Sequence, residues 1–358
     1  MIRSLTRRCN KMASIADSDR LLSSMQELLK DAGLYNRQHG YYARVMSGTL
    51  SLFILGIMGI ILTHNTLWIL LLVAVFQSFV STQFGFLAHD AVHDQIFASQ
   101  KANRAIALFC GFVMWLSPSW WGDKHNTHHR YPNALGKDRD INISIFALTQ
   151  IQALSKHWPI TIIVKYQAIF FVPAIFMLEA LSIRLDSLQH LIFSLLGKKE
   201  VTYRPVEFAI FLIHPIVYFG LLFWLIDPWY HAALFIVVHQ GFLGAYMGLV
   251  FATNHKGMLM IDEDTKLDSL RLQVLTTRNV TGGWLVDFLM GGLNFQIPHH
   301  INSWMPRCNL KKANEICRDF CEEHDITYCE MSVWKAYHTI FAFLHRIGSV
   351  LRKKLATS

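Results

Sequence analysis

Eight of the eighteen histidines lie in four short motifs whose spacing is typical of metal ligands. They are His89 and His93 in HDAVH, His125, His128 and His129 in HNTHH, His255 in ATNHKG, and His299 and His300 in QIPHH. Residues three or four positions apart share one face of a helix, so the first two motifs each direct their imidazoles into one small volume. Adjacent helical residues point about 100° apart, so a pair of neighbouring histidines suits two metal ions better than one. The pattern predicts a site for two metals.

The ligand type restricts the identity of these metals. Neutral imidazoles suit iron, copper or zinc. A structural zinc ion takes four ligands, and eight histidines are too many for one ion. We therefore predict two irons. Five nearby aspartates are candidates for orienting the imidazoles, with a role as solvated loop charges as the alternative: Asp90, Asp94, Asp123, Asp138 and Asp140.

The elements that position these histidines have the composition of a membrane protein. Of the 358 residues, 53% are hydrophobic and only 16% are charged, whereas about a quarter is usual in a soluble protein. Four apolar runs approach or exceed the ~20 residues that a membrane-crossing helix needs: 45–62, 67–88, 208–226 and 229–252. The net charge of +8 flanks these runs, which favours the lipid bilayer over nucleic acid as the partner of the basic residues.

The four runs read as two hairpins. Their turns, THNT and Asp227-Pro228, contain no lysine or arginine, whereas segment 1–44 contains eight, so both termini are predicted to be cytoplasmic. All histidine motifs then lie at cytoplasmic ends of spans, provided that an even number of crossings separates HNTHH from His255. For that reason the apolar stretches 105–121 and 160–183 are predicted to lie in the interface and not to cross.

These observations predict an all-α membrane protein with four transmembrane helices in two hairpins. A cytoplasmic helical cap, made of residues 89–207 and 253–330, holds the di-iron site. The tail 333–354 is basic and amphipathic, which is typical of a helix anchored on a membrane surface. The natural task of two irons at a membrane is to activate O₂ against an unactivated C–H bond.

The motifs HDAVH, HNTHH and QIPHH, in this order and topology, resemble those of the integral-membrane fatty acid desaturases. The stretches WWGDKHNTHHRYPN, FATNHKGM and GGLNFQIPHH extend the resemblance over residues 40 to 348. The chain is most similar to bacterial acyl desaturases whose third motif begins with glutamine, a feature shared with front-end desaturases. The resemblance implies a desaturase domain over 45–355, a fatty acyl substrate, two irons and O₂ as co-substrate.

The resemblance also implies a division of the ligands. One iron would be held by His89, His129, His255 and His299, and the other by His93, His125, His128 and His300. Gln296 stands where many relatives have a ninth histidine, and Asn254 is expected to approach the first iron through water. Val92 replaces a customary glycine in the first motif and Pro298 a customary glutamate in the third, so the double-bond position is not carried over.

The electrons must come from another protein. The sequence has no haem-binding H-P-G-G, no G-x-G-x-x-G after a strand pattern and no iron–sulfur cluster of cysteines, and 44 residues before the first span are too few for a fused cytochrome b5 domain. The family implies an external NAD(P)H-dependent reductase with ferredoxin or cytochrome b5. A hydroxylase or acetylenase with the same irons is the alternative. A metal-ion transporter is more remote, because its ligands would lie near the midplane of the spans.

Overall fold

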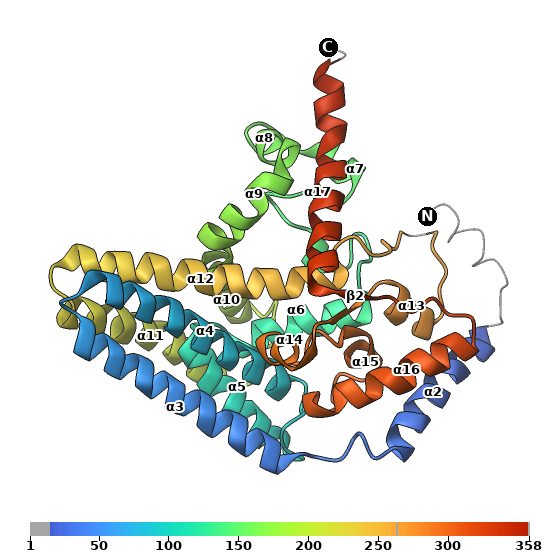
Figure 1. The fold of residues 1–358 in the computed structure, drawn as a ribbon, viewed down its shortest axis with the longest axis horizontal. Helices are drawn as coiled ribbons and strands as arrows, with labels where there is room; N and C mark the ends of the chain where they lie inside the picture. Colours follow the sequence, from blue (N-terminus) through green and yellow to red (C-terminus); the bar gives the residue numbers. More distant parts are fainter. Residues whose placement is uncertain (1–14, 263, 357–358) are drawn as a thin grey trace.

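The computed structural model describes residues 15–262 and 264–356, and helices dominate it (Figure 1). The first 14 residues of the predicted N-terminal segment, including Cys9, lie outside the described residues. Both predicted hairpins are present. The first joins α3 (His39–Thr63) to α4 (Leu67–Val92), and the second joins α11 (Arg204–Leu225) to α12 (Trp229–His255).

The two hairpins pack against each other through their apolar faces. At the hairpin turns, Ile60 and Leu70 of the first hairpin share a buried cluster with Leu222 and Phe235 of the second. The outward faces also carry large apolar side chains, such as Leu62 and Trp224, which are 77% and 78% exposed. A helix that is apolar on all sides is suited to a lipid environment. These are the helices of an integral membrane protein.

Five described helices are long and apolar enough to cross a membrane, one more than the four predicted from the sequence. The additional one is a continuous segment, 167–195, made of α9 (Gln167–Ala174), the π-helical turn η2 (Ile175–Glu179) and α10 (Ala180–Leu195). In Figure 1, α9 leads away from α12 and does not run along it. A sixth span is counted only if α5 (Gln100–Met114) and α6 (Pro118–Arg130), which meet at a bend of 106°, form one broken helix.

Two glycines of α12 let the segment 167–195 approach closely. A Cβ atom on Gly244 would lie 2.7 Å from the carbonyl oxygen of Ile175 and 3.1 Å from the amide nitrogen of Ala180. A Cβ atom on Gly248 would lie 3.1 Å from the side chain of Ile175. Helix backbones in membranes come this close where small residues face the partner. The contact therefore fixes η2 against α12.

A helical cap covers one end of the hairpins. Its members α2 (Ile15–Asp31), α13 (Ser269–Leu275), α15 (Gln296–Ile301) and α16 (Leu310–Glu323) share one buried apolar cluster, which includes Met25, Leu270, Ile297 and Cys317. Two short parallel strands, β1 (Asn279–Thr281) and β2 (Glu330–Ser332), tie the cap together. The short elements η1 (Arg139–Ile141), α14 (Gly283–Leu289) and η3 (Arg307–Asn309) complete it.

The C-terminal tail forms α17 (Val333–Ala356), as its amphipathic pattern predicts. Its apolar face is buried: Ile340, Leu344 and Ile347 belong to one buried cluster. The same cluster contains residues of α7 (Gln150–Ser155), α8 (Ile160–Lys165) and α9. The side-chain amide of Gln167 donates a hydrogen bond to the carbonyl oxygen of Leu344 at 3.1 Å. The tail is therefore packed onto the α7–α9 segment, and Figure 1 shows the two standing out from the hairpins together.

We expect Gly244→Leu to lower the melting temperature of the purified protein by several degrees. The leucine side chain has no space between α12 and η2, and overpacking of this kind costs about 1–3 kcal/mol. Gly220→Leu on α11 is the matched control, since a Cβ atom there meets nothing within 4 Å. Thermal unfolding in detergent compares the two. Equal melting temperatures would contradict the close approach of η2 to α12.

Candidate metal centre

The structure brings all eight motif histidines together at one end of the hairpins. α4 supplies His89 in its last turn and His93 as its C-cap, α12 supplies His255 as its last residue, and α15 supplies the adjacent pair. The three histidines of HNTHH lie on α6. Seven of the eight side chains are at least nine-tenths buried: His89, His93, His125, His128, His255, His299 and His300. The four motifs, which lie far apart in the sequence, therefore meet in one place in the structure.

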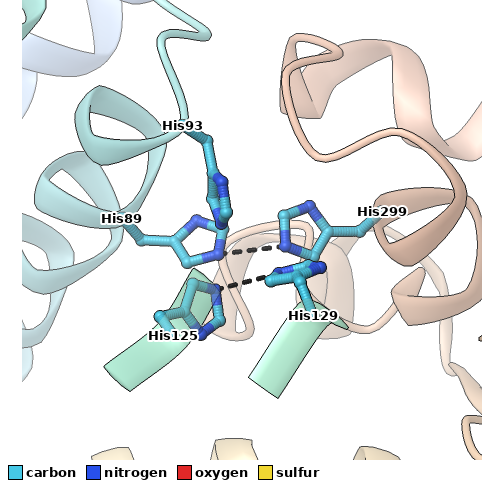
Figure 2. Close-up of side chains that lie close together, drawn as sticks. All are labelled: His89, His93, His125, His129 and His299. Atoms are coloured by element: carbon cyan, nitrogen blue, oxygen red, sulfur yellow. Dashed lines mark hydrogen bonds between the residues drawn. The ribbon is translucent and has the colours of Figure 1, made fainter. Parts of the chain in front are cut away.

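Five of the imidazoles form one cluster, shown in Figure 2: His89, His93, His125, His129 and His299. They come from α4, α6 and α15, and one ring nitrogen of each lies within 4.8 Å of the others. Two contacts are closer still. The Nε2 atoms of His89 and His299 are 3.1 Å apart, and so are those of His125 and His129.

The remaining three imidazoles form a second cluster beside the first. His128 and His255 approach to 3.2 Å between their Nε2 atoms, and His300 lies with them. The rings of His129 and His300 stack at a centroid distance of 4.2 Å and so link the two clusters. The two adjacent pairs of the sequence, 128–129 and 299–300, each contribute one histidine to each cluster.

This grouping of ring nitrogens differs from the division of ligands that the family resemblance implies, and that division stays a prediction. His255 lies in the smaller cluster and not with His89. His93 and His125 lie in the larger one and not with His128. The order of the histidines along the sequence does not predict how they group. The grouping depends on how α12 and α15 are rotated relative to α6.

Gln296 and Asn254 both lie at the smaller cluster. The Gln296 amide nitrogen is 3.3 Å from Nε2 of His255. The Asn254 side chain donates to Oε1 of Gln296 at 3.1 Å and to the carbonyl oxygen of Leu293 at 3.0 Å. Gln296 is thus held in the position of a fourth group beside three histidines, and Asn254 holds it there. Asn254 lies at this cluster and not at the one that contains His89 and His299.

The nitrogen positions fit bound metal ions. A first-row metal binds imidazole nitrogen at about 2.1 Å, so neighbouring ligand atoms around it are separated by roughly 3.0–3.4 Å. The three closest Nε2 pairs lie at 3.1, 3.1 and 3.2 Å. The Nε2 atoms of His93 and His300 are buried without a hydrogen-bond partner. Orphaned buried nitrogens of this kind are costly unless a ligand satisfies them.

The opposite ring nitrogen of four histidines is held by an oxygen. The pairs are His128 Nδ1 with Asp138 Oδ2 at 2.9 Å, His300 Nδ1 with Gln273 Oε1 at 2.9 Å, His255 Nδ1 with the Thr276 carbonyl at 3.2 Å and His89 Nδ1 with Asp90 Oδ1 at 3.2 Å. An oxygen acceptor places the proton on Nδ1 and leaves the lone pair of Nε2 facing the cluster. The arrangement therefore sets both the tautomer and the direction of these rings.

Of the five candidate aspartates, Asp90 and Asp138 contact a histidine of the clusters most closely. Asp140 lies 3.6 Å from His128 and pairs with Lys124 at 2.8 Å. Asp123 pairs instead with Arg139 and Lys199. Sequence reasoning missed Gln273 and Thr276, which lie on and after α13 and carry no motif.

Arg307 is a further residue that sequence reasoning did not assign. Its Nε lies 3.0 Å from Asp90 Oδ2, and both side chains are buried. It stands in MPRCNL, shortly after the third histidine motif. The ion pair places a positive charge behind the carboxylate that holds His89.

Burial favours the neutral form of six of the eight imidazoles. It lowers the pKa of His299 and His300 well below the ordinary value of 6.5, and the surrounding histidines lower the pKa further. The pKa of His128 is raised: burial opposes the rise, but the hydrogen bond to Asp138 and the charge of Asp140 outweigh it. A neutral imidazole offers its lone pair to a metal, so the low values suit ligands.

Asp138→Ala should lower the metal content of the purified protein, because His128 then loses the acceptor that orients it. Partners of this kind are worth about 10–100-fold in metal affinity. Asp123→Ala is the matched control on the same stretch of chain, since its carboxylate pairs with Arg139 and Lys199. Metal analysis after dialysis against a chelator measures the difference. Equal metal loss in both variants would remove Asp138 from this role.

Comparisons with known proteins show which proteins the chain is similar to. The chain is 30% identical to the Delta(6)-fatty-acid desaturase fat-3 of Caenorhabditis elegans, over 96% of the chain and 79% of that protein. It is 27% identical to the acyl-lipid (9-3)-desaturase of Physcomitrium patens, over 93% of the chain and 64% of that protein. It is 29% identical to the acyl-lipid 8-desaturase of Rebecca salina, over 69% of the chain.

The chain spans 64% and 56% of the length of the moss and Rebecca salina proteins, which is less than two thirds of either. The profile of the fatty acid desaturase family matches residues 65–332, a stretch that contains all eight histidines of the two clusters. With this match over most of its length, the chain belongs to the fatty acid desaturase family.

Proposed function

We propose that the protein is an O₂-dependent membrane desaturase that introduces a C=C double bond into a fatty acyl chain. The observation that carries the proposal is the pair of adjoining histidine clusters, five imidazoles beside three, with Gln296 at the smaller one. Eight nitrogens in two groups suit two irons held side by side. Family membership supplies the acyl substrate, and all the curated relatives named above are desaturases of fatty acyl chains.

In this proposal the protein side chains would hold the two irons, orient the imidazole rings and exclude water from the site. Bound iron would supply the activation of O₂. Asp90, Asp138 and Gln273 turn three of the rings so that Nε2 faces inward. Deep burial of the histidines excludes bulk water, which strengthens the electrostatic interactions inside the site and limits side reactions with solvent.

The electron balance requires a supply of electrons besides the substrate. Removing two hydrogens from an acyl chain releases two electrons and two protons, whereas reducing O₂ to two waters consumes four electrons and four protons. Two electrons and two protons must therefore be supplied. Since the sequence carries no haem, flavin or iron–sulfur motif, we assign this supply to an NAD(P)H-dependent reductase acting with ferredoxin or cytochrome b5.

The proposed topology has four spans, α3, α4, α11 and α12, with the site and both termini in the cytoplasm. HNTHH on α6 lies against His255, so an even number of crossings separates them. α11 and α12 already supply two. The segment 167–195 therefore lies along the membrane and does not cross it, in spite of its apolar composition. The hairpin turns, which lack lysine and arginine, lie on the opposite side.

The direct test is product analysis with purified protein, O₂, NADH, a reductase with cytochrome b5 or ferredoxin, and acyl substrates. We expect about two irons per chain and a new double bond, seen by gas chromatography with double-bond mapping. NADH without the reductase should give no product. His300→Ala should lose iron and activity, whereas His64→Ala in the turn between α3 and α4 should keep both. An alcohol or a triple bond as the product would replace the desaturase by a hydroxylase or acetylenase.

Gln296 tunes the smaller cluster in this proposal. Its amide offers a weaker donor than an imidazole nitrogen. Gln296→His should keep both irons and change turnover, because the electronic balance of one iron changes. Gln296→Ala should cost more activity, because it vacates the position and removes one of the hydrogen bonds of Asn254. Iron content and the Mössbauer spectrum of both variants check this. If both match the parent, Gln296 is a bystander.

A further inference from the structure

Four consecutive polar residues are fully buried beside the smaller cluster, although none of them is a histidine: Thr276, Thr277, Arg278 and Asn279. This 276–279 segment joins α13 to β1. Polar groups are buried at low cost only where hydrogen-bond partners satisfy them. The partners of the segment therefore show which elements it holds. They include the last turn of α12 and the first turn of α15, the two helices that carry His255 and the pair 299–300.

The first end of the 276–279 segment holds the last turn of α12. The carbonyl oxygen of Thr276 lies 3.2 Å from Nδ1 of His255. The backbone amide of Arg278 donates to the carbonyl oxygen of Asn254 at 3.0 Å, and its guanidinium donates to the carbonyl oxygen of Lys256. The last carbonyls of a helix have no partner within the helix, so these contacts fix the end of α12. A cation at this end also suits the helix dipole.

The other end of the segment holds the beginning of α15. This helix has only six residues, and its N-cap residue Phe295 makes no capping hydrogen bond through its side chain. A helix so short is not stable alone, and the amides of its first turn need partners from elsewhere. Oδ1 of Asn279 accepts a hydrogen bond from the backbone amide of Ile297 at 2.8 Å. Asn279 therefore does from β1 what a capping side chain does from within the chain of the helix.

The direction of the Asn279 amide is fixed by two other elements of the cap. Its Nδ2 donates to Oδ1 of Asn314 on α16 and, at 3.0 Å, to the hydroxyl of Tyr328 before β2. The Tyr328 hydroxyl donates in turn to Oδ1 of Asn314 at 2.7 Å. Both partners of Nδ2 are oxygens, which accept hydrogen bonds, so the amide oxygen of Asn279 must face α15.

We propose that Asn279 is a positioning residue of the smaller cluster. It places α15 so that His300 and Gln296 meet His255, which the first end of the same segment holds. Two of the four groups at the smaller cluster come from α15, whereas His299 is one of five histidines in the larger one. A change at Asn279 therefore disturbs the smaller cluster more. This role rests on the two bound metals of the proposed function and is independent of the reaction that they perform.

Two substitutions separate the acceptor of Asn279 from its bulk. Asn279→Leu keeps the size and removes the acceptor for Ile297. Asn279→Asp keeps an oxygen facing Ile297, and the Tyr328 hydroxyl can turn to donate to the second oxygen. The contacts between Val280 and Asn294, at 2.8 and 3.0 Å, still tie the chain that enters α15 to β1 in both variants.

Asn103→Leu is the matched control for the loss of a buried asparagine. Asn103 on α5 is also fully buried, and its side chain hydrogen-bonds the backbone of Phe97 at 2.8 and 3.0 Å and of Ser99 at 3.2 Å. We expect both leucine variants to lower the melting temperature by several degrees, because each leaves buried backbone groups without a partner. Melting temperature alone therefore does not distinguish a positioning role from a structural one.

The distinguishing measurement is iron content after dialysis against a chelator, with the Mössbauer spectrum of the purified full chain. The parent, Asn279→Asp and Asn103→Leu should keep about two irons. Asn279→Leu should keep about one and lose one of the two iron signals, because partners that orient ligands are worth about 10–100-fold in metal affinity. Two irons with the parent spectrum in Asn279→Leu would overturn the proposal. Equal iron loss in Asn103→Leu or in Asn279→Asp would do so too, as would loss of both irons together from Asn279→Leu.

Product analysis of the same preparations tells this role apart from the proposed reaction. A parent that holds two irons and forms no double bond would overturn the desaturase function, while loss of one iron from Asn279→Leu would still support the positioning role. A parent that forms the double bond, with iron content and spectrum unchanged in Asn279→Leu, would overturn the positioning role and leave the desaturase function standing.

Discussion

The approach of imidazole nitrogens to about 3 Å of one another is the contact on which the rest of this structure depends. Two imidazoles at that distance repel unless they share a proton or face one cation, and burial makes charging them still more costly. The pairs at 3.1 and 3.2 Å come from α4, α6, α12 and α15, so four separate elements must hold them against this repulsion. The packing of these elements opposes the repulsion between the nitrogens. A bound metal ion would remove the repulsion itself.

The hairpins are the first part of that support. Each begins at the metal end, turns at the far side and returns, so its second helix ends at the site. α4 and α12 therefore run side by side towards the site (Figure 1), with His89 in the last turn of α4 and His255 as the last residue of α12. Phe84 and Leu87 of α4 pack with Leu243 and Met247 of α12 in one buried cluster, which fixes the level of the two helix ends.

Much of this was accessible from the sequence, because helical spacing and apolar length are local properties. The spacing in HDAVH and HNTHH predicts histidines that share one helix face, and the four apolar runs predict both hairpins. The grouping of His255 with His128 was not accessible, because it depends on the rotation of α12 relative to α6. Hydropathy cannot distinguish a helix that lies along a membrane from one that crosses it, so the prediction that 160–183 lies in the interface rests on the even number of crossings between HNTHH and His255. Gln273 was missed because an uncharged side chain carries no spacing signal.

The ion pair of Asp90 and Arg307 connects the support of the site to its surroundings. A buried carboxylate is costly alone, but here it meets both the His89 ring and a guanidinium, so its desolvation is offset. Arg307 is itself held by the carbonyl oxygen of Gly291 at 3.4 Å and by the ring of Tyr41 at 5.9 Å from its centroid. The residues after the third motif thus brace the first motif from behind. The same guanidinium also lines a cavity between α3 and α14, so the ion pair connects the wall of that cavity to His89.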